Sequence, residues 1–217
     1  KDFFTAEGEV DPQKIKKIAK ETIANPNIPV SFDLEFGNRF KPETVIPKIR
    51  QVLQCYHRYQ PKAQVGIYGT IPQNTYTWKP AISRYDELND KYKSLVALVD
   101  FLSPVLYNYD GSNFPAWLKS AKYNIEAAKK YASEKPILPF ISPIIRVGKT
   151  DLVKKGNLVE ELNEEAMAKR LQTLYELGAS GCIIWASSQD RTKDGQIPTF
   201  DPDKAWGKAV VEFLKTH

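Results

Sequence analysis

The sequence predicts an α/β fold: a parallel (β/α) barrel of the TIM type, incomplete or distorted, with leading strands missing. Helical and strand patterns alternate along the 217 residues. The strand patterns are nearly continuous apolar runs, which is typical of parallel strands covered by helices. No linker or internal repeat interrupts them, so residues 1–217 are expected to form a single barrel domain. We count five strand patterns, too few to close an eight-stranded barrel.

Capping residues and apolar stripes mark the helices. Asp11-Pro12 supplies an N-cap followed by proline at the first helical position, and Lys41-Pro42 begins the next helix. Gly178 is suited to end the helix before it. The expected helices run from Asp11 to the stop at Asn25-Pro26-Asn27, onward from Lys41, over 85–95, 114–133 and 163–177, and from Asp201 to Lys215.

Short apolar runs between these helices mark the strands. They cover residues 28–35, 64–69, 99–107, 136–145 and 181–187. Gly66 and Gly69 in the second strand indicate a close backbone approach or a bend. Loops that follow barrel strands carry function, so Tyr76 and Trp78 in the loop 70–83 are candidates to line a site.

Composition and charge exclude several classes. With 42% hydrophobic and 26% charged residues the chain fits an ordinary globular protein, and no apolar run is long enough to span a bilayer. No signal peptide is visible at Lys1. The net charge of +5 is compatible with an acidic polymer as substrate. The basic residues are spread over helix faces and form no nucleic-acid motif, so no nucleic-acid partner is expected. The oligomeric state is left open.

Cysteine and histidine give no sign of a metal site or a cofactor. Cys55 and Cys182 each lie inside an apolar pattern and are expected to be small buried side chains. His57 and His217 show no ligand spacing. We therefore expect no metal and no cofactor.

The first strand ends in two acids. Side chains alternate along a strand, so Asp33 and Glu35 share one face with Ser31, while Phe32 and Leu34 point to the other. Two neighbouring carboxylates should not ionise alike, since one charge disfavours the other. One protonated and one ionised acid at the carboxyl end of a barrel strand make a working pair for glycoside chemistry. The alternative is a hydrated strand end with two solvated acids.

Four stretches carry motifs of one family, in that family's order, over most of residues 28 to 190. They are the acid pair 33–35, Gly66-Ile67-Tyr68 with Pro72 and Tyr76 downstream, residues 89–107, and the segment Leu-Gly-Ala-Ser-Gly-Cys-Ile-Ile-Trp-Ala-Ser-Ser at 177–188. Together they resemble the hyaluronidases of the bee-venom and mammalian type. The last stretch is the most specific.

The resemblance implies a hydrolase of N-acetylhexosamine polymers such as hyaluronan or chondroitin. It implies a retaining, substrate-assisted mechanism, with Glu35 as general acid and base and Asp33 orienting the substrate's acetamido group. It also implies that Tyr107 donates a hydrogen bond to the sugar and that Trp185 forms an apolar floor under it. An extracellular or cell-surface location would follow from the family.

Three more residues are pocket candidates: Tyr68, Tyr76 and Asn108. Tyr68 is more often a core residue than a site residue. For Tyr107 and Trp185, core packing is the less favoured alternative.

The sequence also departs from the family. Phe36-Gly37-Asn38 replaces Trp-Arg-Pro after the acids, a second substrate-facing tyrosine has no counterpart, and Arg146 is displaced. The family's disulfide cysteines are absent. Two alternatives therefore stay open: a muramidase-like cell-wall hydrolase, and a catalytically silent carbohydrate-binding protein on the same scaffold. A working Glu35 should have a raised pKa and give an acid-side activity optimum.

Overall fold

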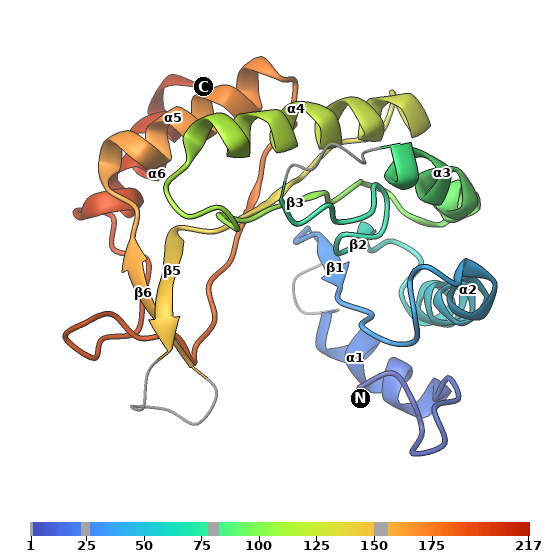
Figure 1. Ribbon diagram of the computed structural model, residues 1–217. Coiled ribbons are helices and arrows are strands. Elements are labelled where there is room, and N and C mark those ends of the chain that lie inside the picture. Colours follow the sequence, from blue (N-terminus) through green and yellow to red (C-terminus); the bar gives the residue numbers. More distant parts are fainter. Residues whose placement is uncertain (1, 23–26, 78–82, 150–155) are drawn as a thin grey trace. The chain divides into compact units, whose positions relative to one another are not determined.

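The computed structural model describes residues 2–22, 27–77, 83–149 and 156–217 (Figure 1). The chain forms two compact units, and it passes between them more than once. The first unit comprises Lys1–Asn74, Ala81–Pro104 and Ala127–Pro136. The second comprises Thr75–Pro80, Val105–Glu126 and Ile137–His217. A single barrel domain over residues 1–217 stays a prediction.

Helices alternate with parallel strands in the first unit. Its elements are α1 (Pro12–Thr22), β1 (Val30–Phe32), α2 (Pro42–Tyr59), β2 (Val65–Ile67), α3 (Ser83–Tyr92) and the 3-10 helix η1 (Lys93–Leu98). β1 and β2 pair in parallel. α1 begins as predicted, because the Asp11 carboxylate accepts hydrogen bonds from the Gln13 and Lys14 backbone N–H groups at 2.9 and 3.2 Å. The predicted stop at 25–27 lies largely outside the described residues.

The apolar face of β1 packs on helix α2, as the alternation predicts. Phe32 is buried and meets the ring of Tyr56 edge to face, with centroids 4.8 Å apart. Gly66 in β2 confirms the close approach expected of it. A Cβ atom there would lie inside van der Waals contact with the ring of Phe101.

The predicted strand 99–107 is shorter than expected. Only β3 (Val105–Leu106) is a regular strand, and it belongs to the second unit. The preceding residues, 99–104, run beside β2 and are joined to it by isolated interactions. The Asp100 carboxylate accepts the Val65 N–H at 2.8 Å, and Tyr68 pairs in parallel with Ser103.

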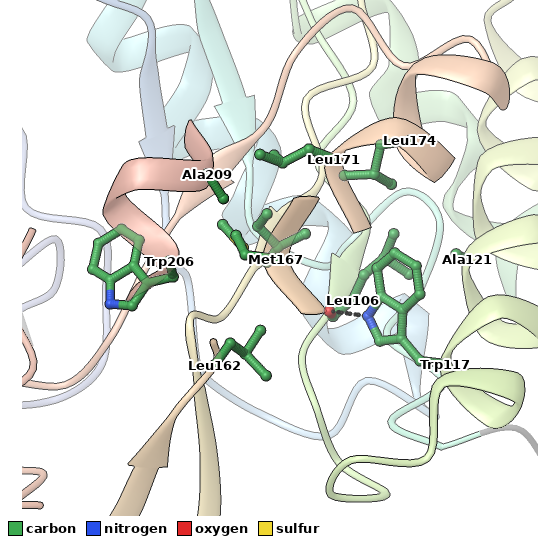
Figure 2. Packing of buried hydrophobic residues seen from close by; sticks show 10 residues of the cluster. Leu106, Trp117, Ala121, Leu162, Met167, Leu171, Leu174, Trp206 and Ala209 are labelled. Atoms are coloured by element: carbon green, nitrogen blue, oxygen red, sulfur yellow. Dashed lines mark hydrogen bonds between the residues drawn. The ribbon is translucent and has the colours of Figure 1, made fainter. Parts of the chain in front are cut away.

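The second unit is built on a three-stranded parallel sheet, ordered β3-β4-β7. Its elements are β3, most of α4 (Phe114–Tyr131), β4 (Phe140–Ile141), β5 (Ile144–Lys149), β6 (Asn157–Glu161), α5 (Glu164–Glu176), β7 (Ile183–Ile184) and α6 (Ala205–Thr216). Helices α5 and α6 pack against each other. Figure 2 shows the core between helices and sheet, where the indole N–H of Trp117 donates to the Leu106 carbonyl at 2.8 Å.

Two sequence predictions for this unit were wrong. The predicted strand 136–145 is split, because Ser142-Pro143 breaks it after β4 and the chain continues as the antiparallel hairpin β5–β6 (Figure 1). The described ranges therefore contain seven short strands, against five predicted. Asp201 does not cap the last helix. α6 begins at Ala205, and the Asp201 side chain closes a turn by accepting the Asp203 N–H at 3.0 Å.

The remaining helices agree with the sequence to within a few residues. Asn163 caps α5 by accepting the Ala166 N–H at 2.8 Å, and Gly178 follows α5 with a positive φ of 80°. None of the helices in the described ranges is both long enough and apolar enough to cross a membrane.

Candidate functional site

The two predicted acids follow β1 directly in the first unit, at the carboxyl end of a parallel strand. The Tyr68 N–H donates to the Phe32 carbonyl at 2.9 Å, so β1 stays paired up to the residue before Asp33. After Glu35, the ring of Phe36 packs edge to face on Phe4 with centroids 4.7 Å apart. The short acidic segment is thus anchored on both sides, and both acid side chains are exposed.

The two acids influence each other electrostatically. Although Asp33 is exposed as a residue, its carboxyl group is partly desolvated, which raises its pKa above the ordinary value, and the negative charge of Glu35 raises this pKa further. The raised pKa of Asp33 is one half of the unequal pair that the sequence predicts, and the assignment of Glu35 as the acid stays a prediction. Asp33 keeps its proton to a higher pH than an isolated aspartate would.

Tyr68 lies on the neighbouring strand. It follows β2 directly, is half-buried, and its backbone bonds to Phe32 on one side and pairs with Ser103 on the other. Asp33 and Tyr68 therefore follow adjacent parallel strands at the same edge of the sheet. Tyr68 remains a pocket candidate.

The second unit contains an aromatic cluster, which we define as Tyr76, Tyr107, Tyr109 and Trp185. The rings of Tyr107 and Trp185 stack nearly parallel, at 18° with centroids 5.7 Å apart. The ring centroid of Tyr109 lies 5.9 Å from that of Tyr107 and 5.2 Å from that of Tyr76, which it meets edge to face. Trp185 is 49% exposed and Tyr76 is 50% exposed. Aromatic rings of this kind, half in solvent, suit the apolar faces of sugars.

The cluster brings together three residues that the sequence singled out and one that it missed. Tyr76, Tyr107 and Trp185 were predicted to line a site. Tyr109 was not, although its spacing of two from Tyr107 is the period that keeps side chains on one face of an extended chain. Trp78 lies outside the described residues.

Asn108 makes its hydrogen bonds within the protein. It is buried, and its amide N–H groups donate to the Ser142 and Ile144 carbonyls at 2.8 and 2.9 Å. Its carbonyl oxygen accepts the Arg170 Nε–H at 3.0 Å. These bonds fix the backbone between Tyr107 and Tyr109, and a part for Asn108 in binding a ligand stays a prediction.

The remaining candidates lie outside these two groups. Arg146 is exposed on the hairpin strand β5. Cys55 is buried, as predicted, whereas Cys182 is only partly buried. Burial raises the pKa of the Cys182 thiol to about 11. Within the described ranges, no three His, Cys, Asp or Glu side chains gather in a way that could hold a metal ion.

Comparison with solved structures identifies similar folds. An endo-1,4-β-D-mannanase from Thermotoga petrophila matches with a TM-score of 0.58 at 16% identity, over 95% of this chain and 64% of that one. A chitinase domain from Pyrococcus furiosus matches with a TM-score of 0.54 at 17% identity, over 99% and 71%. Bee venom hyaluronidase matches with a TM-score of 0.47 at 19% identity, over 94% and 59%.

These similarities concern the fold. The neighbours are TIM-barrel enzymes. The described strands form a two-stranded parallel sheet in the first unit, and a three-stranded parallel sheet and an antiparallel hairpin in the second, so a barrel stays a prediction. The similarity is one of fold, and it does not single out hyaluronidases. The chain spans between 49% and 64% of the length of the first four structures that it matches. No family model matches the chain. No curated protein matches it either.

Proposed function

We propose that the chain is a glycoside hydrolase whose acid–base chemistry is carried by Asp33 and Glu35. The observation that carries the proposal is the position of this pair, directly beyond a parallel strand, with the pKa of Asp33 raised by burial and by the charge of Glu35. Paired carboxylates with different pKa values are the working groups of most glycosidases. The fold shared with a mannanase and a chitinase supports the proposal.

In the proposed reaction Glu35 first donates its proton to the glycosidic oxygen as the bond to the anomeric carbon breaks. The acetamido carbonyl oxygen of the substrate attacks that carbon from the opposite face and forms a cyclic intermediate. Asp33 orients the acetamido group and stabilises the positive charge that develops there. Ionised Glu35 then takes a proton from water, which opens the intermediate with overall retention.

The proposed substrate is a polysaccharide that contains N-acetylhexosamine, of the hyaluronan or chondroitin type. Within the second unit, the half-exposed face of Trp185 would support a sugar ring, and Tyr107 would donate a hydrogen bond to the sugar. The chitinase domain with a similar fold was solved in complex with chito-oligosaccharides, which supports a sugar of this class. An extracellular location belongs to the same proposal.

The experiment measures reducing-end release from hyaluronan, chondroitin, chitin oligomers and peptidoglycan. The variants are Glu35→Gln, Asp33→Asn and, as a matched control, Glu87→Gln, which alters another exposed acid of the first unit. We expect one polymer to be cleaved, with loss of cleavage only in the first two variants. Cleavage of peptidoglycan alone would favour the muramidase alternative, and cleavage that survives Glu35→Gln would contradict the assigned acid.

A silent carbohydrate-binding protein is the second candidate function. The observation that favours it is the aromatic cluster, whose four rings contact one another inside the second unit without any contribution from the acids. Tight oligosaccharide binding by the folded protein, with no release of reducing ends from any of the four polymers, would establish this second function.

A further inference from the structure

Tyr76 is held in an unusual backbone conformation. Its φ is +58°, in the left-handed region, which is strained for a bulky side chain. Even so, half of its surface is exposed to solvent. Strained residues of this kind gather at functional sites, where the surrounding structure imposes them.

A buried polar network imposes the strain. Thr75, directly before Tyr76, is 2% exposed, and its hydroxyl accepts a hydrogen bond from the Asn124 amide at 3.1 Å. The hydroxyl of Ser120 lies 3.4 Å from the same oxygen. Ser120 and Asn124 are both buried on α4. The helix therefore fixes the turn that presents the ring of Tyr76.

The ring of Tyr76 belongs to the same aromatic cluster as that of Trp185. Within the aromatic cluster, Tyr76 and Trp185 are the half-exposed ends, and the less exposed Tyr107 and Tyr109 connect them. Ring contacts join Tyr76 to Tyr109, Tyr109 to Tyr107, and Tyr107 to Trp185. An oligosaccharide that lies along this cluster can therefore contact both half-exposed rings.

We propose that Tyr76, whose ring packs on Tyr109, forms a second sugar subsite. It would hold an oligosaccharide beyond the sugar that rests on Trp185. This inference rests on the proposed saccharide ligand and narrows it: the protein takes chains of several sugars in preference to short fragments. Stacking on Tyr76 stabilises only those ligands that are long enough to reach it.

The experiment compares ligands of two lengths by isothermal titration calorimetry. The probes are the di- and hexasaccharides of hyaluronan and of chitin, and the variants are Tyr76→Gly and Tyr76→Phe. Glycine adopts positive φ freely, so Tyr76→Gly should fold with a melting temperature at or above that of the wild type. We expect it to weaken hexasaccharide binding about tenfold, the effect of losing one aromatic stack, and to leave disaccharide binding unchanged. Tyr76→Phe should bind like the wild type.

The control is Tyr175→Ala, which removes a 55% exposed tyrosine of the same unit whose ring contacts Phe213 and His217. It should leave both affinities unchanged. Equal losses for both lengths in Tyr76→Gly, or no loss, would overturn the second subsite while the glycosidase proposal stands on its own test with Glu35→Gln. If the wild-type protein binds none of the four probes, the subsite and the proposed saccharide ligand both fail.

Discussion

At the scale of single residues, the raised pKa of Asp33 has a measurable consequence for stability. A carboxyl group whose pKa is higher in the folded than in the unfolded protein binds more protons when folded, so the free energy of unfolding falls as the pH rises through that interval. We expect Asp33→Asn to stabilise the protein at pH 7. The gain should vanish below about pH 4, where the aspartate is protonated in the unfolded chain as well.

Urea unfolding of the wild type and of Asp33→Asn, at pH 7 and below pH 4, checks this. Carboxyl NMR titration of Glu35→Gln provides the control. Removing the charge of Glu35 should lower the pKa of Asp33 without returning it to its ordinary value, because burial is the larger cause. If Asp33→Asn gains no more stability over the wild type at pH 7 than it does below pH 4, Asp33 is an ordinary solvated acid.

Asn108 makes a second prediction at this scale. Asn108→Ala leaves the Arg170 Nε–H and two backbone carbonyls without their buried partner, at a cost of about 2–4 kcal/mol in the free energy of unfolding. Urea unfolding measures that cost. If the amide also positions the neighbouring tyrosines, the near-ultraviolet circular dichroism of the aromatic cluster should change as well. An unchanged spectrum would show that Asn108 stabilises the fold without positioning the tyrosines.

At the scale of elements, the contact between β2 and the segment after η1 can be tested at Gly66. Gly66→Ala places a methyl group against the ring of Phe101 and should destabilise the protein by about 1–3 kcal/mol. The double variant with Phe101→Leu makes room and should recover part of the loss. Full stability in Gly66→Ala by urea unfolding would contradict the close approach.

Helices were easier to predict than strands for a physical reason. Caps such as Asp11 and Asn163 act within a few residues, so a sequence window contains the whole signal. The strands here are two to six residues long, and their bounds depend on partners far along the chain. The hairpin β5–β6 was missed for this reason: its second strand, Asn157–Glu161, is too short to show a clear period.

At the scale of the whole molecule, the sequence singled out residues of the candidate site but contained little about how they are arranged. The acid pair was found from strand alternation, and Tyr107 and Trp185 from resemblance to a family. The contact of Tyr76 with Tyr109 joins residues from a loop and a strand end, so no local pattern could contain it. The same holds for the hydrogen bonds of Asn108, whose partners lie on two other segments, residues 142–144 and α5.

The central claim is that Glu35 is the acid of a glycosidase. The measurement that tests it most directly is the rate of reducing-end release from the polymer that the wild type cleaves, compared with Glu35→Gln and Glu87→Gln across the pH range. We expect an optimum on the acid side, a loss of about 10²–10⁴-fold in Glu35→Gln, and no loss in Glu87→Gln. Equal rates in all three proteins, or no cleavage by the folded wild type, would contradict it.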